Sequence, residues 1–288
     1  MSAQVLQLIV NGVVAGTILA VPAIGLSTIF AVLRFANFAL AGHMAIGAFA
    51  GYVANAWLGL PAYVAILAAF AAAGIVGIVS DHFGLRPLRN YGALTLAIAS
   101  IALNLVLENV LRFGFGNRPR DYAIKLVRDW TFGPIRIGPQ QLENLAIAVA
   151  AMALIFLFLA LTTTGKAMRA VADNPILADI KGIDPDRMAR FANFIGMGLG
   201  GVGGMLVGLD TSVDPLVGFR ALLSVFAAAV VGGLGSIPGA AIGGLFIGLA
   251  EELSLLALPA SYKTAVGFLA ILIMLTLRPR GILGERGL

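Results

Sequence analysis

The sequence of 288 residues contains no cysteine, only two histidines and few charged side chains. Without cysteine the chain has no disulfide bond, no thiolate metal site and no cysteine nucleophile. Charged residues make up 11% of the chain and hydrophobic residues 60%, whereas roughly a quarter of an ordinary soluble domain is charged. The mean hydropathy is +0.98. These values predict a polytopic membrane protein.

The charge that is present is mostly basic, with a net charge of +5 and an isoelectric point near 9.9. A basic chain suits nucleic acid when its Lys and Arg gather on one surface with aromatic side chains. Here they lie at the ends of apolar runs, as membrane topology requires. We therefore expect a lipid bilayer and no nucleic acid as a partner. Residues 1–21 lack a positively charged start, so we expect a retained first span rather than a cleaved signal.

Nine apolar stretches are candidate membrane spans, because a helix needs about 20 apolar residues to cross the hydrocarbon core. They are residues 5–33, 38–57, 61–80, 91–113, 142–161, 191–209, 221–234, 237–258 and 262–277. The seventh stretch is too short to cross comfortably. The sequence thus predicts an all-α fold, a polytopic transmembrane helical bundle of about 8–10 spans, some of them broken. We expect a single transmembrane domain over residues 1–288.

The orientation depends on the charge-rich segment of residues 162–190. If this segment is cytoplasmic, alternation of the spans places the N-terminus in the periplasm and the C-terminus in the cytoplasm. The inside then holds eleven Lys and Arg and the outside eight, the direction that the positive-inside rule favours. The loop of residues 114–141 then lies outside, and the alternating pattern of residues 125–139 predicts a small extended hairpin there.

Capping residues divide the segment of residues 162–190 into short helices. Two pairs each place a capping side chain before a proline suited to the first helical position. Two glycines mark the opening of a helix and a left-handed helix end. These residues are Asn174-Pro175, Asp184-Pro185, Gly165 and Gly182. The segment is either a solvated loop whose basic residues mark the cytoplasmic side, or a docking element for a cytoplasmic partner.

Glycines recur every four residues in the stretch 191–209, at Gly196, Gly200, Gly204 and Gly208. This spacing places a smooth strip along one helix face. In lipid, close approach of backbones along such strips holds spans together, because helix association brings little hydrophobic gain. We interpret the strip as a packing surface, with the lining of a pore as the alternative.

Ionisable residues inside the spans are few. His43 is the only one well inside a span, and it is either a packing histidine or a ligand. Glu108, Glu251 and Glu252 fall near the outer ends of spans, where we expect their side chains to reach water. No series of Asp, Glu or His crosses the bilayer, which argues against a proton-coupled carrier. No carboxylate pair or Ser/His/Asp set suggests an intramembrane enzyme, and we expect no catalytic residue and no metal site.

Nucleotide-binding motifs are also missing. Gly165-Lys166 is followed by Ala167 rather than by Ser or Thr, so there is no phosphate-binding loop. The glycine spacings within residues 196–203 match a dinucleotide fingerprint but lie inside an apolar stretch rather than after a strand. If ATP drives this protein, another chain binds it.

Two irregular segments interrupt the apolar stretches, residues 231–239 (VGGLGSIPG) and 34–42 (RFANFALAG). Such breaks at membrane depth are tolerated only against protein or a water-lined cavity, and they are a good pointer to a transport path. In the second segment Asn37 brings a hydrogen-bond donor and acceptor into an apolar setting. Asn37 is either a pore-facing polar group or a helix cap.

Four blocks together carry a family resemblance: residues 26–49, 165–183, 226–251 and 277–284. The third contains the sequence GGLGSIPGA, which is quite specific. They resemble the LivH-type permease subunits of the branched-chain amino-acid ABC importer family. The resemblance implies a multi-pass permease of the bacterial inner membrane that moves branched-chain amino acids or a related small polar metabolite.

The resemblance also implies partners. These are a LivM-like second permease, two cytoplasmic ATPase subunits of the LivG/LivF type and a periplasmic substrate-binding protein. ATP and Mg would bind to the ATPase subunits, and this chain would have no cofactor of its own. The alternatives are a permease of the same fold for urea, amides, aromatic acids or sugars, and an ATP-independent secondary carrier.

The family's helical loop, residues 163–190 here, contacts the ATPases. The residues carried over to this coupling element are Gly165, Arg169, Ala170, Asn174, Ala178, Gly182 and Ile183. Those carried over to the translocation path are Asn37, Phe38, Gly42, His43, Gly232, Gly233, Gly235, Ser236 and Gly239. His43 departs from the polar or acidic and aromatic mix expected in residues 40–44, which leaves the substrate open.

Overall fold

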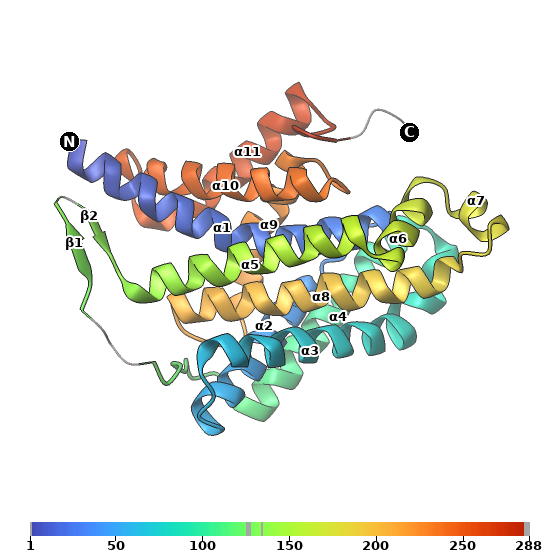
Figure 1. Ribbon diagram of the computed structural model, residues 1–288, viewed down its shortest axis with the longest axis horizontal. Coiled ribbons are helices and arrows are strands. Elements are labelled where there is room, and N and C mark those ends of the chain that lie inside the picture. The colour runs from blue at the N-terminus through green and yellow to red at the C-terminus, as the bar shows by residue number, and fades with distance from the viewer. Residues whose placement is uncertain (1, 125–127, 134, 285–288) are drawn as a thin grey trace.

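The computed structural model describes residues 2–124, 128–133 and 135–284. Long helices run roughly side by side, with a β-hairpin at one end of the bundle and the short helices α6 and α7 at the other (Figure 1). The elements are α1 (Ser2–Leu33), α2 (Leu40–Tyr52), α3 (Ala62–Ser80), α4 (Ala93–Phe115), β1 (Trp130–Phe132), β2 (Ile135–Ile137), α5 (Pro139–Leu161), α6 (Thr163–Asp173), α7 (Pro175–Ile180), α8 (Pro185–Asp210), α9 (Val217–Gly232), α10 (Ile237–Leu253) and α11 (Lys263–Leu277).

The predicted all-helical, polytopic fold is confirmed. Among the described residues, 7 helices are long and apolar enough to cross a membrane. They correspond to seven of the nine predicted spans. The other two predicted spans form the shorter helices α2, which continues as a π-helical turn (Val53–Trp57), and α9 of 16 residues. Helix α9 begins four residues earlier than the predicted stretch 221–234 and ends two residues earlier.

Helix α8 is the centre of the bundle and packs against α1, α2 and α3. Of its most apolar stretch 89% is buried, against 6% for α11 at the periphery. A Cβ atom on Gly204 would overlap the carbonyl oxygen of Met44 in α2, and one on Gly196 would lie 2.6 Å from the Gly25 carbonyl oxygen in α1. The packing interpretation of the glycine strip is therefore confirmed, because the backbones of neighbouring helices occupy the space of the missing side chains.

Helices α2 and α9 both begin inside the bundle. The Leu40 side chain fills the space beside Gly200, near the middle of α8. A Cβ atom on Gly218 would overlap the Ala41 carbonyl oxygen, so the start of α9 lies against the start of α2. Residues 34–39, here called the α1–α2 linker, form no helix and run inward from the exposed Arg34. The linker therefore brings irregular backbone into the middle of the protein.

The predicted hairpin within residues 125–139 is confirmed for the described part. Strands β1 and β2 pair antiparallel with Thr131 opposite Arg136, whereas residues 125–127 and 134 lie outside the described residues. The preceding segment is tied to the helices, because Tyr122 Oη donates a hydrogen bond of 2.8 Å to the Ala48 carbonyl oxygen. Burial raises the pKa of this hydroxyl above its ordinary value, so Tyr122 stays protonated and remains a donor.

Candidate functional site

Helix α6 opens the segment predicted to contact a partner. Thr162 caps it, because the Gly165 N–H donates to the Thr162 hydroxyl at 2.9 Å. The prediction that Gly165 opens this helix was wrong by two residues, since α6 begins at Thr163. Gly165 instead allows a close approach: a Cβ there would lie 2.5 Å from the Leu159 Cα in α5. The sharp turn from α5 into α6 therefore depends on this glycine.

The capping signals of α7 and α8 are confirmed. The Leu177 N–H donates to Asn174 Oδ1 at 3.0 Å, and Pro175 is the first residue of α7. The helix closes at Gly182, whose φ of +84° lies in the left-handed region. The Ile183 N–H then donates to the Ala178 carbonyl oxygen at 2.9 Å. Asp184 and Pro185 start α8 in the same way.

Helix α7 projects from the end of the bundle (Figure 1) and presents apolar side chains to its surroundings. Ile176 is 74% exposed and Ile180 is 75% exposed, and Leu177 is also exposed. Arg169 of α6 is exposed, whereas Ala170 is half-buried and Ala178 is buried. Large apolar groups on a short projecting helix indicate a contact surface for another protein.

Two polar connections join this end of the bundle to the interior. The Arg34 guanidinium donates to the Ala172 carbonyl oxygen in the last turn of α6, where a cation is favoured by the helix dipole. Arg34 has a φ of +57°, a left-handed conformation unusual for this residue. The residue that begins the α1–α2 linker is therefore attached directly to α6.

The second connection is an ionic network between the end of α3 and the start of α8. Arg89 donates to both carboxylate oxygens of the buried Asp81, at 2.7 and 3.0 Å. Asp186, in the first turn of α8, accepts from Arg86 at 2.7 Å and from Arg89 at 3.2 Å. A movement of the start of α8 is thereby linked to α3.

The first predicted path block, residues 34–42, consists of the α1–α2 linker and the first residues of α2. Asn37 is fully buried, and its Oδ1 accepts from the Ala39 N–H at 3.1 Å, which is a local turn just before α2. Its Nδ2 has no hydrogen-bond partner among the described residues. The Phe38 N–H donates to Ser100 Oγ of α4 at 3.0 Å, and the Phe38 ring lies 5.5 Å from the Phe226 ring of α9. The linker is thus held by α4 and α9.

Gly42, in the first turn of α2, allows α4 to approach. A Cβ atom on Gly42 would lie 2.9 Å from the Leu107 Cβ and 3.1 Å from Asn104 Oδ1. Asn104 is buried, and this Oδ1 atom has no hydrogen-bond partner among the described residues.

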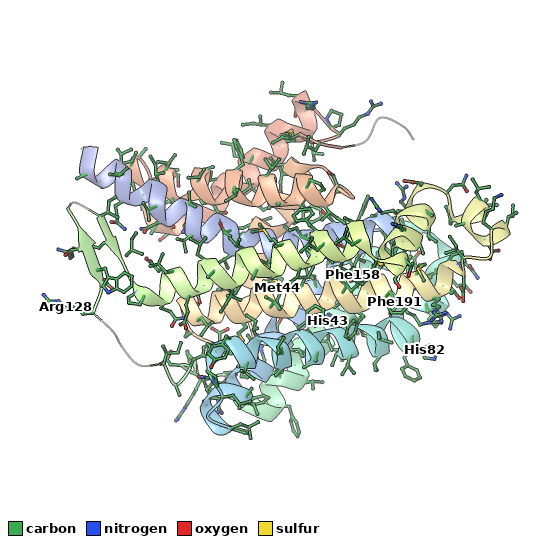
Figure 2. The ribbon with its side chains drawn as sticks, viewed as in Figure 1. His43, Met44, His82, Arg128, Phe158 and Phe191 are labelled. Atoms are coloured by element: carbon green, nitrogen blue, oxygen red, sulfur yellow. The ribbon has the colours of Figure 1, made fainter. Side chains whose placement is uncertain are left out.

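His43 belongs to α2 and is fully buried. Figure 2 labels its place within the bundle. Its Nδ1 lies 2.7 Å from the Ala39 carbonyl oxygen and therefore carries the proton. Its Nε2 lies 3.1 Å from Ser80 Oγ. Both ring nitrogens have partners, so the geometry supports the packing alternative for His43.

The second predicted path block forms the connection between α9 and α10. Residues 233–236, here called the α9–α10 turn, contain Gly233 and Gly235 with φ of +109° and +88°. Ser236 caps α10, because the Gly239 N–H donates to its hydroxyl at 3.2 Å. A Cβ atom on Gly232 would overlap the Gly239 carbonyl oxygen. These glycines allow two helix ends to cross in close contact.

The surroundings of residues 231–239 come from the end of α1 and from the C-terminal segment. The α9–α10 turn packs beside Ala31 at the end of α1, and the C-terminal segment closes it. The Ile282 N–H donates to the Val231 carbonyl oxygen at 2.8 Å, and the Leu283 N–H to that of Gly232 at 2.9 Å. The turn therefore lies at the α6 end of the bundle. Phe38 of the first block contacts Phe226 of α9, the helix that leads into the second block.

The expectation that three glutamates reach water was wrong. Glu108, Glu251 and Glu252 are 6%, 5% and 8% exposed. Glu108 pairs with Arg112 and Glu252 with Lys263, while Glu251 accepts from the Ser224 hydroxyl at 2.6 Å. Partners from the same or a neighbouring helix satisfy these carboxylates, so they need not reach water.

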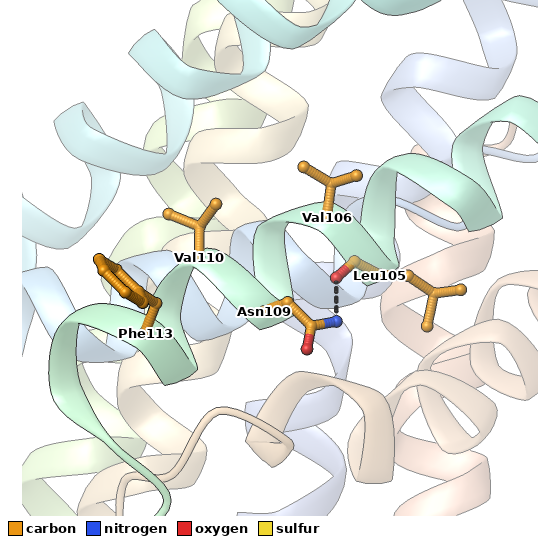
Figure 3. Close-up of a pocket in the computed structure, with 5 residues that line it drawn as sticks. All are labelled: Leu105, Val106, Asn109, Val110 and Phe113. Carbon is orange, nitrogen blue, oxygen red and sulfur yellow. Dashed lines mark hydrogen bonds between the residues drawn. The ribbon is translucent and has the colours of Figure 1, made fainter.

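The outward face of α4 carries an open apolar depression of about 490 Å³ (Figure 3). Its one polar side chain, Asn109, donates to the Leu105 carbonyl oxygen at 2.7 Å within the same helix. Phe113 is 95% exposed. A face whose polar group is already satisfied suits lipid or another apolar helix and has no group for binding a polar solute.

Comparison with known proteins covers nearly the whole chain. The sequence model of the family described as branched-chain amino acid transport system / permease component matches residues 8–277. The high-affinity branched-chain amino acid transport system permease protein LivH of Escherichia coli (strain K12) is 31% identical over 97% of this chain and 96% of its own length.

Two further relatives agree. The permease protein BraD of Pseudomonas aeruginosa is 31% identical over the same shares. A LivH permease protein of Methanocaldococcus jannaschii is 28% identical over 96% of this chain and 92% of its own length. Matches of this extent place the chain in a multi-subunit ABC transporter as a multi-pass membrane subunit rather than an enzyme. The chain therefore belongs to the permease component family of branched-chain amino acid transport systems.

Proposed function

We propose that this chain is the inner-membrane permease subunit that moves branched-chain amino acids, or a related small polar metabolite, into the cell. The observation that carries the proposal is the α6–α7 module (Thr163–Ile180). It is rigidly capped, it projects from the bundle with apolar side chains exposed, and Arg34 attaches it to the α1–α2 linker. These are the properties that a lever driven by another protein requires.

The coupling element comprises residues that cap, close or pack this module. Asn174 and Gly182 begin and end α7, and Gly165 fixes the turn from α5. Arg169 is exposed for contact with a partner. Ala170, Ala178 and Ile183 provide the packed side of the module and its exit into α8.

Two cytoplasmic ATPase subunits of the LivG/LivF type would bind ATP and Mg and would contact the exposed face of α7. When they close, α6 would move and pull on the α1–α2 linker through Arg34. The ionic network at Asp186 would carry the start of α8 and the end of α3 with it. The path would then change access around Asn37, Phe38 and Gly42, with the α9–α10 turn, Gly232 to Gly239, as a close-packed pivot.

The orientation follows from the same proposal. The α6–α7 end and the C-terminus face the cytoplasm, and the N-terminus and the loop of residues 114–141 face the periplasm. The hairpin end would then meet the periplasmic substrate-binding protein. The exposed apolar faces of α4, α5 and α11 remain for lipid and for a LivM-like second permease.

Reconstitution tests the proposal. The chain is assembled with the LivM-like permease and both ATPase subunits in proteoliposomes, and uptake of radiolabelled leucine is measured with binding protein, with and without ATP. We expect accumulation only when ATP and all subunits are present. Accumulation by this chain alone without ATP would instead identify a secondary carrier and contradict the proposal.

A further inference from the structure

Asn193 is a buried amide that the sequence did not single out. It lies in α8, its exposed fraction is 0%, and neither its Oδ1 nor its Nδ2 has a hydrogen-bond partner among the described residues. The Nδ2 of the equally buried Asn37 also lacks one. Buried polar groups are almost always paired, because leaving one unpaired costs its desolvation. Ser27, Asn104 and Asn144 each also have one unpaired atom, but Asn193 is the amide among the described residues with both side-chain atoms unpaired, so it in particular needs an explanation.

The contacts between α8 and α2 put Asn193 at the level of the α1–α2 linker. Gly200 of α8 meets Leu40, and Gly204 meets Met44, so α8 and α2 run in the same direction at this contact. Asn193 precedes these glycines by seven and eleven residues, which puts it on the same helix face, two turns nearer the start of α8. The chain that precedes Leu40 is the linker that contains Asn37.

Helix α3 closes the other side of this position. A Cβ atom on Gly77 would lie 3.3 Å from the Asn193 carbonyl oxygen. One turn along α3, Ser80 contacts His43, whose Nδ1 carries the proton. The polar groups assembled around Asn193 from the linker, α2 and α3 are thus amides, a hydroxyl and an imidazole. The carboxylate of Asp81, next after Ser80 at the end of α3, is paired with Arg89.

An uncharged polar lining has a definite selectivity. An amide N–H can donate to a carboxylate, and an amide oxygen can accept from an ammonium group, so a pair of amides serves both ends of a zwitterion. Without a fixed charge the lining gives no advantage to a solute with net charge. A small solute of zero net charge, such as a zwitterionic amino acid, fits this chemistry.

We propose that Asn193 and Asn37 form a binding site for a small net-neutral polar solute in the translocation path. The site opens to water when the α1–α2 linker moves away from α8, and it rests on the proposed function. In the closed arrangement seen here the two amides are sealed from water, which explains their unmet hydrogen bonds. Asn193 therefore contacts solute rather than packing the helices.

The first test is Asn193→Leu in the complete importer in proteoliposomes. If Asn193 only packed the helices, removing its unpaired amide would cost no stability and leave transport intact. Unchanged leucine uptake would therefore overturn the proposal. We expect uptake to fall about 10-fold, as the loss of one good hydrogen bond to the solute predicts, while the thermal unfolding midpoint does not fall. The matched control is Asn144→Leu, because Asn144 in α5 is also buried with an unpaired Nδ2. Its uptake should stay unchanged.

The second test uses the absence of cysteine from the chain. An Asn193→Cys variant, assembled with partner subunits free of reactive cysteine, is treated with a membrane-impermeant methanethiosulfonate reagent. We expect modification to be at least about 10-fold faster in one of two states, nucleotide-free or trapped with ATP and vanadate, and to block uptake. Leu199→Cys is the control, because this buried side chain faces Gly25 of α1, and it should not react in either state.

The outcomes separate the two proposals. If the wild-type importer takes up leucine with ATP but Asn193→Cys does not react in either state, the solute site is wrong and the permease function stands. If the wild-type importer shows no ATP-dependent uptake, the proposed function fails, and the solute site fails with it.

Discussion

At the scale of single residues, two features describe the interior: glycines that allow close helix packing, and buried polar side chains with or without hydrogen-bond partners. Glycines in α8 let the backbones of α1, α2 and α3 touch the backbone of α8. A larger residue at these positions would push the neighbouring helices away from α8. Polar groups fall into two kinds. His43 and Glu251 have partners, whereas Asn193 and the Nδ2 of Asn37 have none among the residues described. The partners of His43 and Glu251 fit a packing role, whereas the unmet hydrogen bonds of Asn193 and Asn37 fit contact with a solute.

Gly204→Ala tests the packing role. The added Cβ overlaps the Met44 carbonyl oxygen, which is backbone and cannot give way easily. We expect a loss of about 1–3 kcal/mol of stability, seen as a lower thermal unfolding midpoint in detergent. Gly114→Ala is the control, since a Cβ there meets nothing within 4 Å, and a helix favours Ala over Gly by about 1 kcal/mol. Equal midpoints for the two variants would contradict the packing role.

Gly182→Val tests the helix end of α7. A β-branched residue is strained at a φ of +84°, although no atom lies near a Cβ at this position. We expect the end of α7 to shift while the bundle stays folded, so leucine uptake should drop several-fold with little change in the unfolding midpoint. Arg169→Glu should uncouple ATP hydrolysis from uptake in the same way. Uptake at the wild-type level in both variants would argue against the coupling role.

At the scale of elements, α6 and α7 differ from every long helix around them. They are short, a side-chain cap begins each of them, and α7 exposes isoleucines that a soluble loop would not need. Helices α2 and α9 differ in another way, because they begin inside the bundle and meet at Gly218 and Ala41. Short helices that end within the protein leave irregular backbone where a path can form.

Ile176→Asp together with Ile180→Asp tests the exposed face of α7. The two side chains are 74% and 75% exposed, so the change should not destabilise the chain. We expect binding of the ATPase subunits to weaken about 100-fold, since each apolar side chain lost from a buried contact costs on the order of 1.5 kcal/mol. Co-purification and ATPase titration measure this. Leu154→Asp, on the exposed face of α5, is the comparison and should leave ATPase binding intact.

At the scale of the whole molecule, burial is distributed unevenly. Helices α1 and α8 form a buried core, whereas α4, α5 and α11 present apolar faces outward (Figures 1 and 2). The ionic network of Asp81, Arg86, Arg89 and Asp186 ties the core helix α8 to α3 near the α6–α7 end. Motion at that end is therefore expected to involve α3 and α8 as a unit.

Arg89→Met tests this tie. The variant leaves the buried Asp81 carboxylate without its partner. Breaking a buried ion pair lowers the free energy of unfolding by about 3–5 kcal/mol. Because Arg89 is partly exposed, we expect a loss at the lower end of this range. Adding Asp81→Leu to Arg89→Met removes the unpaired charge and should recover most of the unfolding midpoint. A double variant as unstable as Arg89→Met alone would show that the pair does not act as a unit.

Sequence patterns determined much of this protein. Apolar runs gave the long helices because a span must satisfy its backbone internally, and Asn174, Gly182 and Asp184 fixed the short helices because caps act within a few residues. Only the tertiary structure decided which groups contact residues that are distant in the chain. Glu251 is satisfied by Ser224, the α9–α10 turn is closed by residues 278–284, and the Asn193 carbonyl oxygen lies against Gly77 of α3. No local pattern encodes such contacts, because packing of the whole bundle brings these residues together.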